Sequence, residues 1–124
     1  MTPREAGRPG DFGVRGTFRD RLGKSHQFHS LYERRRMALF DAAGYRFLRE
    51  PVRIPYRFGG RKRVYRPDFA IWDRQGRPYY IEEVKPQVRF ADPLNQAKFA
   101  AARAWCQARG WRFRVVTEAT LDRL

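Results

Sequence analysis

The spacing of hydrophobic and polar residues predicts a helix early in the chain. Residues 31–43 place hydrophobic side chains near helical spacing. Ser30 precedes them and Glu33 lies three residues later, which is the pattern of a capping box. Gly44 follows as a typical helix stop. We therefore predict a first helix over residues 31–43, with residues 25–29 as a candidate extension at its start.

Alternating hydrophobic residues predict three strands after this helix. The first extended stretch covers residues 45–58, and Gly59-Gly60 after it is a hairpin signal. A returning strand is expected over residues 63–72 and a third over residues 78–85, which Pro86 ends. Hydrophobic side chains recur at every second position of the first stretch, at Val52, Ile54, Tyr56 and Phe58.

A second helix and a last strand complete the pattern. Asp92 and Pro93 are a typical N-cap and first helical residue, and Gly110 is the matching stop. The predicted apolar face of this helix consists of Leu94, Ala97, Ala101, Ala104, Trp105 and Ala108. Residues 111–117 then alternate as a strand. The helix would join the third and fourth strands in parallel, which predicts an α/β fold with a mixed sheet flanked by helices.

The net charge of the chain is the strongest indication of its binding partner. The 124 residues include 27 Lys and Arg against 13 Asp and Glu, a formal net charge of +14. This surplus favours a polyanionic partner, nucleic acid before an anionic membrane. Residues 1–24 are rich in Gly and Arg and are interpreted as a basic flexible arm, with the folded domain over residues 25–124.

The number of cysteines and the length of the apolar runs indicate where in the cell the protein works. The single cysteine, Cys106, excludes a disulfide within the chain. No apolar run has the length of a membrane span, and the N-terminus lacks the apolar stretch of a signal peptide. We expect a cytoplasmic protein, in a bacterial or phage-infected cell, without membrane association.

Acidic residues on the second and third predicted strands form the candidate chemical site. Asp68 lies on the second strand, while Glu83 and Lys85, two residues apart, share a face of the third. Glu82 faces the opposite way by the same alternation. Two carboxylates on rigid strands could bind Mg²⁺, which polarises a phosphate and acidifies a bound water, and a neighbouring lysine could stabilise negative charge.

These motifs resemble a known nuclease superfamily. Pro67-Asp68-Phe69, followed some fifteen residues later by Glu83-Val84-Lys85, is similar to the PD-(D/E)xK pattern. The fuller set, with Ser30-Leu31-Tyr32-Glu33 before it, most resembles the N-terminal catalytic domain of TnsA, the endonuclease subunit of a heteromeric transposase. The resemblance covers roughly residues 30–120. It implies a restriction-endonuclease-like αβββαβ core.

The resemblance also implies roles for individual residues. Glu33, Asp68 and Glu83 would bind Mg²⁺, for which Mn²⁺ would substitute, and Lys85 would position the attacking water or the phosphate. TnsA proteins usually carry a second helical domain, and we do not expect one within these 124 residues. Phage junction-resolving endonucleases share the same motifs, so that role stays open, as does a non-catalytic DNA-binding module with this fold.

Basic clusters flank the acidic motifs and are the candidates for contacts with phosphates. The runs are Arg34-Arg35-Arg36 and Arg61-Lys62-Arg63. The expected DNA-binding residues are Arg34, Arg35, Arg61, Lys62, Arg63, Arg66 and Lys98. Expected partners are DNA, a transposase subunit or other mobile-element or phage proteins, and a second copy in a homodimer.

Overall fold

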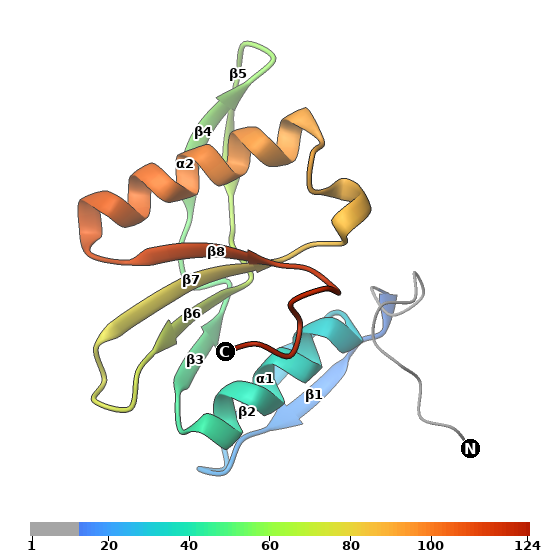
Figure 1. Cartoon of the computed structure of the whole chain (residues 1–124), viewed down its shortest axis with the longest axis vertical. Coiled ribbons are helices and arrows are strands. Elements are labelled where there is room, and N and C mark those ends of the chain that lie inside the picture. Colours follow the sequence, from blue (N-terminus) through green and yellow to red (C-terminus); the bar gives the residue numbers. More distant parts are fainter. Residues whose placement is uncertain (1–12) are drawn as a thin grey trace.

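The computed structural model describes residues 13–124, which form a mixed sheet with a helix on each face and two further hairpins (Figure 1). The elements are, in chain order, β1 (Gly16–Arg19), β2 (Ser25–Phe28), α1 (Leu31–Ala43), β3 (Arg46–Arg49), β4 (Ile54–Phe58), β5 (Arg61–Tyr65), β6 (Phe69–Trp72), β7 (Pro78–Val84), the short 3₁₀ helix η2 (Gln87–Arg89), α2 (Pro93–Arg109) and β8 (Arg112–Val116). Neither α1 nor α2 is long and apolar enough to cross a membrane.

The main sheet has the strand order β3-β6-β7-β8. The first two pairs are antiparallel, and β7 and β8 are parallel because α2 carries the chain across between them. Alternation along β6 separates two cores: Phe69 and Ile71 pack with α1, while Ala70 packs with Cys106 of α2. The predicted α/β fold with an αβββαβ core is confirmed.

The two helices begin and end where the sequence predicted, but their buried faces differ from the prediction. In α1 the N–H of Glu33 donates to Ser30 Oγ (3.0 Å), and Gly44 ends the helix in the left-handed region at φ 79°. Its buried residues are Tyr32, Glu33, Arg36, Met37 and Phe40. Those of α2 are Asn95, Phe99, Ala102 and Cys106, while Ala104 and Ala108 of the predicted apolar face are exposed.

The N-terminal part departs from the predicted arm. Residues 16–19 and 25–28 form the antiparallel hairpin β1–β2, so residues 25–29 do not extend α1 backward. His26 of β2 is buried, stacks on Phe47 (ring centroids 4.2 Å apart) and contacts Asp20 Oδ2 through Nε2 at 2.8 Å. These tertiary contacts stabilise an extended segment that has little periodicity of its own. Residues 1–12 of the predicted arm lie outside the described residues.

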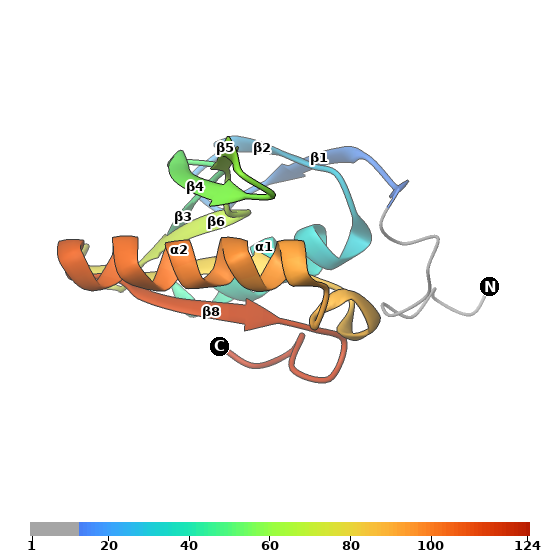
Figure 2. The same cartoon turned by 90° about the horizontal axis from the view of Figure 1, so that it is seen from above.

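The two long strands predicted over residues 45–72 are each divided. Glu50, at φ 49°, ends β3 in the left-handed region, which a residue other than glycine adopts only under local constraint. Beyond this corner β4 and β5 pair only with each other. Their inner side chains, Ile54 and Tyr65, pack against Ala102 of α2. The β4–β5 hairpin, called the distal hairpin, therefore packs on α2 and is not part of the main sheet (Figures 1 and 2).

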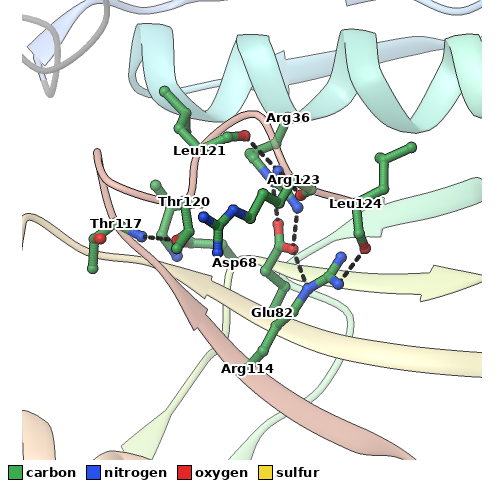
Figure 3. Close-up of polar contacts among 10 residues, drawn as sticks. Arg36, Asp68, Glu82, Arg114, Thr117, Thr120, Leu121, Arg123 and Leu124 are labelled. Carbon is green, nitrogen blue, oxygen red and sulfur yellow. Dashed lines mark hydrogen bonds and ion pairs between the residues drawn. The ribbon is translucent and has the colours of Figure 1, made fainter.

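A buried ion cluster joins α1, the sheet and the C-terminal segment (Figure 3). The side chains of Arg36 and Glu82 are fully buried and form a two-pronged pair, with Nε–Oε2 at 2.9 Å and Nη2–Oε1 at 2.6 Å. Arg114 Nε donates to the same Oε1 at 2.7 Å. Arg36 Nη1 also donates to the carbonyls of Leu121 and Arg123. The segment after β8 is thus held against α1 by a buried guanidinium.

Replacing Glu82 by glutamine tests this cluster. Glu82→Gln removes the only buried negative charge that pairs with Arg36 among the described residues. Breaking such a pair from one side costs about 3–5 kcal/mol, so we expect a loss of that order in the free energy of unfolding, measured by urea denaturation. The control is Asp122→Asn, whose exposed pair with Arg35 contributes at most about 1 kcal/mol. Equal losses in the two variants would contradict the assignment.

The buried Cys106 side chain leads to a second prediction. It is 1% exposed, and burial raises the pKa of its thiol to about 11. Because the thiolate is the reactive form, roughly one thiol in a thousand is ionised at pH 8. Native protein should therefore react with an aromatic disulfide reagent far more slowly than urea-unfolded protein, measured by absorbance. Equal rates in the two states would show that the thiol is accessible.

Candidate functional site

Asp68 and Glu83 meet where β6 begins and β7 approaches its end. Phe69 pairs with Glu82, so the next position of the same register brings Asp68 beside Glu83. Asp68 Oδ2 accepts the backbone N–H of Val84 at 2.7 Å. The N–H of Glu50 donates to the Asp68 carbonyl at 2.8 Å. The backbone and side chain of Asp68 are therefore both held by neighbouring strands.

The Glu83 carboxylate is buried and has two polar partners. Tyr65 donates its hydroxyl to Oε1 at 2.8 Å, and Lys85 Nζ lies 3.3 Å from Oε2. Burial and the charge of Glu83 raise the pKa of the Tyr65 hydroxyl well above its usual range, so it remains a donor. Sequence analysis did not identify Tyr65 as a site residue. The only signal was its position at the end of a strand, three residues before Asp68.

The two carboxylates oppose each other's ionisation. Burial first, and then the charges of Glu83 and Glu33, hold the pKa of Asp68 well above its usual range. Burial also raises the pKa of Glu83, although Lys85 and the Tyr65 hydroxyl counteract part of this effect. The charge near Asp68 is therefore incompletely compensated by the side chains around it. This imbalance is what a bound cation would relieve.

Glu33 lies close enough to act on the charge of Asp68, but its carboxylate has other partners. Its Oε1 accepts the N–H of His29 at 2.8 Å and Nε of Arg49 at 3.1 Å. Arg49 was not predicted from the sequence, because nothing in its surroundings marks it as a partner of an acidic residue. Across residues 13–124, no group of three or more His, Cys, Asp or Glu side chains is placed to hold a metal ion. The role of Glu33 as a ligand stays a prediction.

The pair Asp68 and Glu83 nevertheless fits a hard divalent cation. Mg²⁺ prefers oxygen ligands and is commonly bound by one or two carboxylates, while waters and phosphate oxygens complete its shell. Both carboxylates come from strand ends of the main sheet, and the half-buried Lys85 stands beside them. Glu82, by contrast, is directed to the other face of β7 toward Arg36, as alternation predicted.

The predicted DNA-binding residues lie on three elements. Lys98 on α2 is half-buried, with Nζ 5.8 Å from the Tyr65 ring centre. Burial and the neighbouring charge of Lys85 lower the pKa of Lys98. Arg34 and Arg35 are exposed on α1, where Arg35 Nη2 contacts Asp122 at 2.6 Å. The other four predicted residues are also exposed and lie on the distal hairpin and the segment after it: Arg61, Lys62, Arg63 and Arg66.

One basic residue that the sequence grouped with the phosphate-binding candidates is excluded. Arg36 shares the run Arg34-Arg35-Arg36, yet its side chain is fully buried against Glu82. Successive residues on a helix are turned by about 100°, so the three arginines point in different directions, and Arg36 is the one that lies on the buried side. The Arg36 side chain therefore lies in the core and is not available for contacts with phosphates.

Comparison with known proteins identifies the family. The family model described as TnsA-like endonuclease N terminal matches residues 45–118, more than half of the 124 residues. No curated protein matches the chain. The matched span contains Asp68, Glu83 and Lys85, whereas Glu33 lies before it. By its matched span and its mixed-sheet fold, the chain belongs to the family of TnsA-like endonuclease N-terminal domains.

Proposed function

We propose that this protein is a metal-dependent DNA endonuclease that hydrolyses phosphodiester bonds, in the manner of a TnsA-like subunit that cuts at transposon ends. The observation that carries the proposal is the pair of half-buried Asp68 and buried Glu83, which repel each other and have Lys85 beside them. Carboxylates so placed suit a divalent cation better than they suit a structural role, since the pair lowers stability without one.

Asp68 and Glu83 would hold Mg²⁺, with Mn²⁺ as a substitute. When bound, the cation would neutralise the scissile phosphate and lower the pKa of a coordinated water. The protein's own contribution is placement. Val84 orients Asp68 through its N–H, and Tyr65 orients Glu83 through its hydroxyl. Glu33, which acts on the charge of Asp68, is proposed as a further ligand once its contacts with His29 and Arg49 are exchanged.

Lys85 is the proposed group that holds the phosphate or the attacking water. Its Nζ is a charged donor 3.3 Å from Glu83 Oε2, and its backbone N–H is held by the Val116 carbonyl at 2.9 Å. A cation held in this way stabilises the negative charge that develops on the phosphate as the bond breaks.

DNA is the proposed partner because the net charge of +14 favours a polyanion. We place the activity in the cytoplasm, together with a transposase subunit or other mobile-element proteins, and a homodimer is proposed as one assembly. The family match favours transposon-end cutting over the resolution of four-way junctions. Comparing cleavage of a branched DNA with cleavage of a linear duplex separates these two roles.

Neutralising Asp68 should slow cutting strongly and yet stabilise the fold. Asp68→Asn keeps an oxygen for the Val84 N–H but removes one of two repelling charges. The loss of a metal ligand worth several kcal/mol lowers the rate of plasmid nicking with Mg²⁺ or Mn²⁺ about 10²–10³-fold. Without divalent cations, the melting temperature should rise by about 2–5 °C. The control is the exposed Asp122→Asn, which should change neither value.

A metal titration covers the case in which cutting requires a partner subunit. Calorimetry of the parent with Mn²⁺ should show a site that Asp68→Asn and Glu83→Gln both abolish and Asp122→Asn retains. A parent that neither nicks DNA nor binds Mn²⁺ through these carboxylates would refute the proposed function and favour a non-catalytic binding module.

Removing the Lys85 charge should separate cutting from metal binding. Lys85→Met keeps most of the side-chain length and leaves the backbone contact with Val116 intact. Loss of one preorganised donor typically costs about 10²–10³-fold in rate. We therefore expect nicking to fall by that factor while the Mn²⁺ site measured by calorimetry persists. Nicking at the parental rate would remove Lys85 from the proposed mechanism.

A further inference from the structure

The distal hairpin β4–β5 extends from the corner at Glu50 past the main sheet (Figure 1). One of its faces, with Ile54, Tyr56 and Tyr65, packs against α2. A hairpin needs only one packed face to be held, so its outer face is available for contacts with other molecules. We call β4 and β5, together with their flanking residues Arg53 and Arg66, the arm. This segment is distinct from the basic arm predicted over residues 1–24.

The outer face of the arm places like charges opposite each other. The register pairs Arg57 with Lys62, and Pro55 with Val64 one step closer to the base. All four are exposed. Among residues 13–124, none forms an ion pair or a hydrogen bond with the side chain of Arg57 or of Lys62. Directly opposed like charges destabilise a strand pair, so an anion between them would relieve a repulsion already present in the fold.

The register also divides the basic run that the sequence treated as one set. Lys62 lies on the outer face with Arg57, whereas Arg61 and Arg63 alternate to the face that packs on α2. There the Arg63 guanidinium lies 5.8 Å from the Phe58 ring centre. The exposed Arg53 and Arg66 flank the base of the arm. Arg57, Lys62, Arg53 and Arg66 thus form a positive surface that was not apparent from the sequence run.

The arm is connected to the carboxylate site through its inner face. Tyr65, the last residue of β5, donates to Glu83 Oε1 at 2.8 Å. Lys98 Nζ lies 5.8 Å from the ring of the same tyrosine. The base of the arm and the carboxylate site thus share Tyr65, and the cation of Lys98 lies near the same ring. A strand of five residues is about 17 Å long, and a two-stranded ribbon fits a major groove about 12 Å wide.

We propose that the arm is a DNA grip, in which Arg57 and Lys62 contact backbone phosphates of duplex DNA beside the major groove, at a distance from the scissile phosphate. The contacts are to phosphates and carry no sequence information. This inference rests on the proposed function, since it takes duplex DNA as the substrate of the carboxylate site.

Removing the two outer charges tests the grip. The double variant Arg57→Gln, Lys62→Gln is compared with the parent in fluorescence anisotropy, with a labelled duplex of about 30 base pairs and EDTA to prevent cutting. Each lost phosphate contact lowers the slope of log K against log salt by about 0.9. We expect duplex affinity to fall at least 10-fold at low salt and the slope to decrease by about 2.

A matched control removes one arginine and one lysine elsewhere. Arg112 on β8 and Lys24 between β1 and β2 are exposed, and neither side chain forms an ion pair with another described residue. The variant Arg112→Gln, Lys24→Gln therefore has the same net charge as the arm variant. Equal weakening in the two double variants would overturn the grip, because the effect would then be one of total charge. The melting temperature of the arm variant should equal or exceed that of the parent.

The outcomes distinguish the grip from the proposed function. If the parent binds the duplex and the arm variant binds it with the same affinity and salt slope, the grip is wrong and the nuclease proposal stands. If the arm variant loses affinity for single-stranded DNA alone, the grip on a duplex is overturned as well. If the parent binds no DNA and shows no carboxylate-dependent Mn²⁺ site, both proposals fail. Calorimetry of the arm variant should show the parental Mn²⁺ site, which would confine the loss to DNA binding.

Discussion

The structure depends on two consecutive glutamates that the central strand β7 buries on opposite faces. Glu82 is directed toward α1, where two arginines compensate its charge with three hydrogen bonds. Glu83 is directed toward α2, where it has one lysine and one tyrosine hydroxyl and lies beside Asp68. Burying an ion without a partner costs several kcal/mol. One face is therefore closed by internal pairing, whereas on the other face burial and the neighbouring carboxylates raise the pKa of Asp68.

This asymmetry explains how a small domain can hold a strained site. The Arg36 guanidinium also binds carbonyls of the C-terminal segment, so one cluster joins α1, β7 and residues 121–123. The aromatic residues Phe40, Phe47 and Phe69 pack around the same face in tilted and edge-to-face contacts. The ion cluster and these aromatic contacts lie on the α1 face of the sheet, opposite the face that carries Asp68 and Glu83.

Some features of the fold and site could be predicted from the sequence because they follow from local rules. Ser30 and Gly44 define α1 through their own backbone chemistry. Strand period two separates Glu82 from Glu83 whatever the tertiary structure. The burial of Arg36 could not be predicted, because its partner Glu82 is 46 residues away and a run of arginines indicates solvent. The prolines at 51 and 55 indicated an irregular strand, but the left-handed corner at Glu50 was not predicted, because a residue other than glycine carries no clear local signal for that conformation.

Tyr65 is part of both the arm and the carboxylate site. It is the last residue of β5, and its hydroxyl is the donor to Glu83 Oε1. The same side chain also packs with Ile54 and Ala102. The seating of the hairpin on α2 and the orientation of the Glu83 carboxylate therefore depend on one residue.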